Sequence, residues 1–149
     1  MDYWKTYLLK IREEYYLQNC RAARDFGVPR PTPYSDKTAN QLTRAVCDFL
    51  KFHGHYSNRV NSMGIQRRTK GGEQKWCYGA SNKGTADITA IIGGKHVSIE
   101  IKVGRDVMSQ HQHREKARVE RAGGHYITVG SMEEFFYWYK SFTQILVNC

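Results

Sequence analysis

The most regular alternation of hydrophobic and polar positions lies in the middle of the chain, on either side of two glycines. Residues 85–92 and residues 96–103 alternate with a period of two, which is typical of half-buried β-strands. Gly93 and Gly94 separate the two segments and supply the backbone freedom that a two-residue hairpin turn requires. The pattern therefore predicts an antiparallel β-hairpin.

Helical patterns flank this hairpin on both sides. Apolar residues recur near a 3.6-residue spacing over residues 3–25, and a proline-containing connector at residues 31–35 follows. Further helices are expected before Gly54, before Gly123-Gly124 and at the C-terminal end. Their first turns are marked by pairs that suit N-terminal caps: Thr38 with Gln41, Ser109 with Gln112, and Ser131 with Glu134.

The predicted order of elements indicates an α/β fold. Additional strands are expected over residues 59–67, 75–78 and 126–129. Helix, strands, helix, strand and helix in this order are typical of a mixed β-sheet flanked by helices. The chain of 149 residues suits one ordinary domain, which we assign to residues 37–149, with residues 1–36 as an added N-terminal helix and connector.

The hairpin register brings two acidic residues together. With Gly93-Gly94 as the turn, Asp87 falls opposite Glu100, and the period of two places Lys102 on the same face. Two neighbouring carboxylates repel each other unless a cation lies between them, and their hard oxygen atoms suit Mg²⁺ or Mn²⁺. The hairpin thus predicts metal-assisted phosphodiester hydrolysis. An ordinary acidic pair beside a lysine on a solvated sheet face is the alternative interpretation.

Composition narrows the class of partner. The formal net charge is +9, from 23 Lys and Arg against 14 acidic residues, so the protein attracts polyanions, of which nucleic acid is the commonest. No apolar run approaches the roughly 20 residues of a membrane-spanning helix, and the N-terminus lacks the pattern of a secretory signal. We therefore expect an intracellular, cytoplasmic protein with no membrane partner and with reduced cysteines.

Several short motifs in this order resemble a known nuclease family. Gly84-Thr-Ala-Asp87, followed after the turn by Glu100-Ile-Lys102, resembles the PD-(D/E)XK signature, with Ala86 at the proline position. Further matches are Arg59-Val-Asn61-Ser-Met-Gly64, Ser109-Gln-His-Gln112 and Gly123-Gly124-His-Tyr126. Over residues 38–142 the chain resembles VRR-NUC domains and, more distantly, archaeal-type Holliday junction resolvases. The resemblance implies a restriction-endonuclease-like fold and a homodimer that cleaves branched DNA, and it admits a phage or mobile element as the source.

The resemblance also implies roles for individual residues. Asp87 and Glu100 match the family's metal-binding acids, the carbonyl of Ile101 a further ligand, Lys102 the catalytic lysine and Gln112 a glutamine near the phosphate. Where many relatives carry a glutamate on the first core helix, this chain has Asn40 and Gln41. An amide is a weaker ligand, so the choice between one metal ion and two stays open. Gln112 alternatively serves only to cap its own helix.

Basic side chains around the predicted site suggest how DNA is held. The candidates for DNA contact are Arg59, Arg67, Arg68, Lys75, Arg105, Arg114 and Arg118. A merely solvated basic face is the alternative for the helix that carries Arg114 and Arg118. We expect His111 and His113 to be polar surface residues, and the aromatic run at residues 135–139 to contribute to an oligomer interface. A non-catalytic nucleic-acid-binding module that retains the fold is the alternative function.

Overall fold

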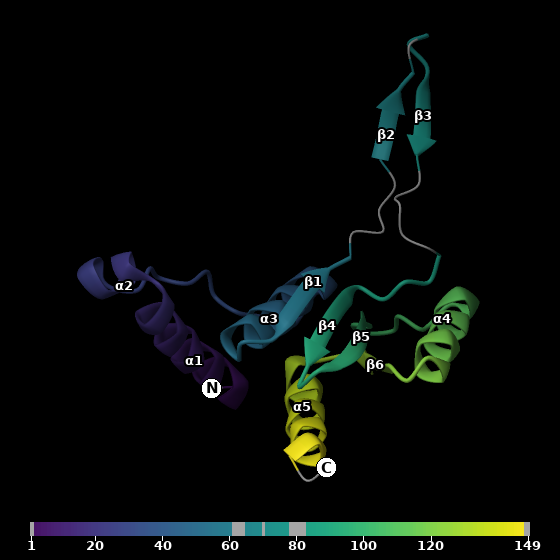
Figure 1. Cartoon of the computed structure of the whole chain (residues 1–149). Coiled ribbons are helices and arrows are strands. Elements are labelled where there is room, and N and C mark those ends of the chain that lie inside the picture. Colours follow the sequence, from purple (N-terminus) through teal and green to yellow (C-terminus); the bar gives the residue numbers. More distant parts are fainter. Residues whose placement is uncertain (1, 61–64, 70, 78–82, 148–149) are drawn as a thin grey trace.

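A four-stranded sheet forms the centre of the molecule (Figure 1). The computed structural model describes residues 2–60, 65–69, 71–77 and 83–147. In spatial order the strands are β1 (Tyr56–Arg59), β4 (Ile88–Ile92), β5 (Lys95–Ile101) and β6 (His125–Val129). The pairs β1–β4 and β4–β5 are antiparallel, whereas β5 and β6 are parallel. The predicted mixed sheet of an α/β protein is therefore confirmed.

The hairpin of β4 and β5 has the predicted register. Ile92 pairs with Lys95, and the last pair of the ladder is Ile88 with Ile99. Gly93 and Gly94 have φ values of 55° and 78°, which a type I′ turn requires at both central positions. Asp87 follows the same register one position beyond the last pair, at the edge of the ladder.

The described part of the chain has five helices. They are α1 (Tyr3–Asn19), α2 (Arg21–Phe26), α3 (Ala39–Phe52), α4 (Gln110–Arg121) and α5 (Met132–Val147). The predicted caps are present: Thr38 Oγ1 accepts from the backbone N–H of Gln41, and Ser131 Oγ accepts from that of Glu134. Within the described residues, no helix has the length and apolar character needed to cross a membrane.

The prediction of one helix over residues 3–25 is wrong. The helix is interrupted at Cys20, whose extended backbone (φ −127°, ψ 113°) separates α1 from α2. The guanidinium of Arg24 donates to the carbonyl oxygens of Leu17 and Gln18, at 3.1 and 3.0 Å. Because these carbonyls belong to the last turn of α1, the arginine satisfies acceptors that the break leaves open.

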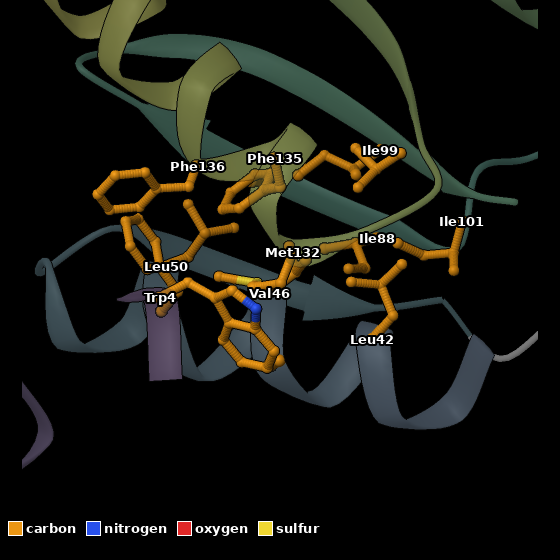
Figure 2. Packing of buried hydrophobic residues seen from close by; sticks show 14 of the residues in the cluster. Trp4, Leu42, Val46, Leu50, Ile88, Ile99, Ile101, Met132, Phe135 and Phe136 are labelled. Carbon is orange, nitrogen blue, oxygen red and sulfur yellow. The ribbon is translucent and has the colours of Figure 1, made fainter. Parts of the chain in front are cut away.

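The hydrophobic core lies between one face of the sheet and helices α3 and α5. Figure 2 shows side chains of α3, such as Leu42 and Val46, together with Ile88 and Ile99 from the hairpin. Phe135 of α5 completes this layer and is fully buried. Trp4 and Leu8 of α1 belong to the same cluster, so the N-terminal helix contributes directly to the core. The proposed boundary after residue 36 stays a prediction.

The basic, glycine-containing segment does not form the single strand predicted over residues 59–67. Strand β1 ends at Arg59 in the main sheet, and β2 (Ile65–Arg68) pairs with β3 (Gln74–Cys77) in a separate two-stranded sheet. Figure 1 shows these two strands standing away from the main sheet. Residues 61–64 and Tyr78 lie outside the described residues. The two strands belong to different sheets because β1 pairs with β4, whereas β2 pairs with β3, the next strand along the chain.

Candidate active site

The end of the hairpin and the N-terminus of α4 bring the predicted catalytic residues together. Val97, Ile99 and Ile101 of β5 point into the hydrophobic core. The period of two therefore turns Glu100 to the opposite face, where α4 follows the loop after β5. Gln112 and Lys102 both contact Glu100 on this face. The face is not solvated as the alternative interpretation assumed, because Glu100 is only 2% exposed.

Each carboxylate oxygen of Glu100 has a donor. Oε1 accepts a hydrogen bond from the Gln112 side-chain amide and lies 3.2 Å from the Lys102 ammonium. The hydroxyl of Tyr126 donates to Oε2 at 3.3 Å. Buried polar groups are almost always hydrogen-bonded, and this carboxylate follows that rule. Tyr126 was not among the predicted site residues, although it stands in one of the motifs and pairs with Ser98 two residues before Glu100.

The electrostatic environment penalises the ionised form of Glu100. Burial raises its pKa and the nearby charge of Asp87 raises it further, while Lys102 and Tyr126 lower it, and the net shift is upward. Burial also lowers the pKa of Lys102, but its contacts with Asp106 and Glu100 outweigh burial and raise it overall. Lys102 is therefore protonated at neutral pH, whereas the charge on Glu100 is held at a cost. A bound cation would relieve that cost.

Asp87 is oriented by the backbone of the neighbouring strand. Its Oδ2 accepts a hydrogen bond from the backbone N–H of Ile101 at 2.9 Å. Its own carbonyl accepts from the N–H of Val60 at 2.8 Å, which ties the residue to the chain beyond β1. The side chain of Ile101 is in the core, so only its backbone is available to the site. The role of the Ile101 carbonyl as a metal ligand stays a prediction.

Gln112 caps its own helix, as one of the two alternatives predicted, and it also contacts Glu100, while its role near the phosphate stays a prediction. Its Oε1 accepts from the Ser109 N–H at 2.8 Å, and its own N–H donates to Ser109 Oγ at 3.3 Å, which completes the capping box. Its Nε2 meanwhile donates to Glu100. One amide can do both because it carries an acceptor and two donors. The cap of α4 is therefore joined to the buried carboxylate.

Gly84 is needed where the loop before Asp87 meets α4. Its φ is +89°, and a β-carbon added there would meet the backbone of His111 and lie 2.9 Å from the backbone nitrogen of Gln112. The sequence presented this glycine only as part of a motif. No periodic pattern indicates such a contact, because it joins a loop to the first turn of a distant helix.

The asparagine proposed as an additional ligand is already engaged. Arg59 Nη2 donates to the side-chain oxygen of Asn40 at 2.6 Å, and both residues are exposed. In the described ranges of the chain, no group of three His, Cys, Asp or Glu side chains is placed to hold a metal ion. Asp106, which the sequence did not single out, lies 3.1 Å from the Lys102 ammonium.

The residues predicted to contact DNA come from several strands, a loop and helix α4. Arg68, Arg105 and Arg114 are exposed. Arg118 is exposed and forms an ion pair with Glu115 at 3.0 Å. Arg67 and Lys75 are opposite each other in the β2–β3 pair, but their side chains lie outside the described structure. His111 and His113 are exposed, as expected. The DNA contacts stay predictions.

The double role of Gln112 predicts unequal effects of two substitutions on α4. Ser109→Ala removes only the cap and is expected to lower the free energy of unfolding by about 1 kcal/mol. Gln112→Ala also removes a donor from the buried Glu100, so it should cost roughly 1–3 kcal/mol more. Urea unfolding in EDTA measures both, with Gln110→Ala as an exposed control on the same helix. Equal losses for Ser109→Ala and Gln112→Ala would show that the Glu100 contact contributes nothing.

Comparison with protein-family models, curated proteins and solved structures gives no match to this chain.

Proposed function

We propose that the protein is a metal-dependent DNA endonuclease that hydrolyses phosphodiester bonds. The observation that carries this proposal is the buried Glu100 carboxylate, held beside Asp87 and contacted by Lys102. A protein rarely buries such a carboxylate unless a partner compensates it, and perturbed ionisable groups cluster at functional sites. The restriction-endonuclease-like arrangement of the sheet and helices belongs to the same proposal.

The residues present fit a hard divalent cation. Asp87 and Glu100 provide carboxylate oxygens, and the Ile101 carbonyl lies in the chain directly beside Glu100. Burial and then the charge of Asp87 raise the pKa of Glu100, and a cation bound between the two carboxylates would offset both effects. A bound Mg²⁺ or Mn²⁺ would supply Lewis-acid polarisation of the scissile phosphate and activation of the attacking water. The amide of Asn40 is weaker support for a second ion.

Lys102 and Gln112 have separate tasks in this proposal. The ammonium of Lys102 is 12% exposed and protonated, so it stabilises negative charge that develops on the phosphate in the transition state. Gln112 holds Glu100 in one orientation and anchors α4 against the site. Asp106 holds Lys102 from its other side. The chain's own side chains therefore preorganise the charges before the substrate arrives.

The preferred substrate in this proposal is branched DNA, such as a four-way junction, and the active form is a homodimer. The motif resemblance supports this choice, and the net charge of +9 favours a polyanionic substrate. Symmetric nicking of a junction needs two active sites, which a homodimer supplies. The exposed Arg105 and Arg114 are proposed to contact the DNA backbone next to the Asp87–Glu100 pair.

A non-catalytic nucleic-acid-binding module is the second candidate function. The engagement of Asn40 by Arg59 favours it, since this removes an oxygen that a metal ion would otherwise use. The two candidates share the basic surface and differ in whether Asp87, Glu100 and Lys102 carry out chemistry. They therefore predict the same binding and opposite results in a cleavage assay.

The proposal is tested by incubating purified protein with labelled four-way junction, linear duplex and single-stranded DNA. Each substrate is combined with Mg²⁺, Mn²⁺ or EDTA. We expect cleavage of the junction with either metal ion and none in EDTA. Binding of the junction without cleavage under all conditions would overturn the nuclease proposal and favour the binding module.

A further inference from the structure

A second basic site lies away from the Asp87–Glu100 pair. A pocket of about 390 Å³ is formed between α1, the connector and α3. Four cationic side chains line it, and one carboxylate, so its net charge is 4 − 1 = +3. The cations are Arg12, Arg30, Arg44 and Lys51, and the carboxylate is Asp48. Figure 1 shows α1 and the connector on the side of the molecule away from α4.

Two of these arginines form hydrogen bonds with the segment that joins α2 to α3. Arg12 Nη2 donates to the carbonyl of Pro29 at 2.8 Å, and Arg44 Nη2 donates to the carbonyl of Thr32 at 2.6 Å. Each guanidinium also lies 4.8 Å from the centroid of a tyrosine ring. A structural role thus accounts for these two side chains. It also fixes the direction of their remaining N–H groups before any ligand arrives.

The other two cations have no comparable structural role. Among the described residues, Arg30 and Lys51 form no ion pair, and the Lys51 ammonium lies 5.6 Å from the centroid of the Tyr15 ring. Asp48 does not compensate them, because its Oδ2 already accepts from the Tyr34 hydroxyl at 2.8 Å and lies 3.8 Å from Arg44 Nε. Like charges gathered around one cavity repel each other unless an anion enters.

The chemistry of the pocket suits a phosphate group that is part of a larger ligand. Guanidinium groups match phosphate oxygens in shape and charge, and they stay protonated at any physiological pH. The cavity volume falls within the range of about 300–1,000 Å³ that is typical of small-ligand sites, so it accommodates more than a bare anion. Tyr16 and Phe52 also line the pocket, and their rings pack with each other and with the Arg12 guanidinium, so they form part of its wall.

We propose that this pocket binds a nucleotide unit of a single nucleic-acid strand through its phosphates. The proposal goes beyond cleavage, because a second contact with nucleic acid needs no hydrolytic centre. A strand held here extends the surface that binds DNA from the α4 side of the molecule to the α1 side. Free nucleotides share the same phosphate chemistry, so the test separates the two sources.

The test compares two double variants that remove the same charge. The pocket variant combines Arg30→Gln with Lys51→Gln and removes the two cations that have no structural role. The control variant combines Lys10→Gln with Arg21→Gln and removes two exposed cations elsewhere on α1 and α2. Affinity for a fluorescein-labelled single-stranded oligonucleotide is measured by anisotropy in EDTA over a series of salt concentrations. We expect about tenfold weaker binding for the pocket variant only, and a salt slope reduced by roughly 1.4, since each lost contact contributes about 0.7.

Calorimetric titration with pyrophosphate and with adenosine monophosphate provides the second arm. Equal loss of oligonucleotide affinity in both double variants would overturn the proposal, because it would reflect net charge alone. The proposal would also be overturned if the pocket variant bound the oligonucleotide as tightly as the unmodified protein but bound adenosine monophosphate more weakly. That result would assign the pocket to a free nucleotide. If the double variant does not fold, Arg30→Gln alone serves, with an expected slope change of about 0.7. Cleavage at saturating DNA is expected to be unchanged, which separates this result from a failure of the nuclease proposal.

Discussion

Replacing Glu100 with glutamine is expected to abolish metal-dependent DNA cleavage while leaving the fold at least as stable as that of the unmodified protein. The substitution keeps the shape of the side chain but removes the negative charge that the metal ion requires. Loss of a preorganised electrostatic contact costs on the order of 10²–10³ in rate, and loss of a metal ligand is expected to reach the upper end of this range. Single-turnover cleavage of a labelled junction measures the loss.

The Glu100→Gln variant is expected to keep its stability because the pKa of Glu100 is raised in the folded protein. Burial and Asp87 raise the pKa of Glu100 above its ordinary value of 4.5. The raised pKa means that the folded protein holds the proton more tightly than the unfolded chain does. Stability from this residue is therefore fully present below about pH 4.5 and is lost as the pH rises through the folded-state pKa. Above that pKa the ionised carboxylate is a net cost, which glutamine removes.

The new amide can keep the hydrogen bonds of the site. Its oxygen can accept from Gln112 and Lys102, and its NH₂ group can donate to the hydroxyl of Tyr126. In EDTA, the Tm of Glu100→Gln should therefore equal or exceed that of the unmodified protein at neutral pH, and the difference should shrink as the pH falls. Glu133→Gln, an exposed carboxylate on α5, is the matched control. A markedly lower Tm for Glu100→Gln at neutral pH would show that the charge stabilises the fold.

The register of the hairpin was predictable because its causes are local. Gly93 and Gly94 provide the positive φ angles of a two-residue turn, and the alternation of residues on both sides agrees with that turn. The approach of Asp87 and Lys102 to Glu100 follows from that register. The burial of Glu100 does not follow from it. Helix α4 and Tyr126 of β6 bury the Glu100 side chain. Packing between residues distant in sequence positions them, and no local pattern predicts it.

The errors in the predicted elements share one physical origin. The helical pattern of residues 3–25 continues through Cys20, although the backbone is extended there and Arg24 donates hydrogen bonds back across the break. Likewise, the residues that follow β1 have strand-forming character, but the partner of a strand decides which sheet it joins. The intrinsic propensity of a segment limits which secondary structures it can form. Its packing against the rest of the protein decides which of them it adopts. The contact of Gln112 with Glu100 is a further feature that the capping motif alone does not predict.

The close approach of Gly84 to α4 gives the second large effect. Gly84→Ala is expected to lower the free energy of unfolding by about 3 kcal/mol, from the cost of φ +89° for alanine and from the clash with the backbone of His111 and Gln112. For a chain of this size that corresponds to a decrease in Tm of roughly 6–12 °C. The backbone atoms of a helix cannot rotate aside as a flexible side chain can, so the loop itself must shift.

The matched control for this substitution is Gly123→Ala at the other end of α4. Gly123 has a similar φ of +83°, but an added β-carbon would meet nothing within 4 Å, so only the conformational cost applies. We expect about 1–2 kcal/mol there and the larger loss at Gly84. Because the loop from Gly84 leads directly to Asp87, Gly84→Ala should also reduce cleavage at a temperature where the variant is fully folded, whereas Gly123→Ala should not. Equal destabilisation by the two substitutions would mean that contact between this loop and α4 does not hold the site together.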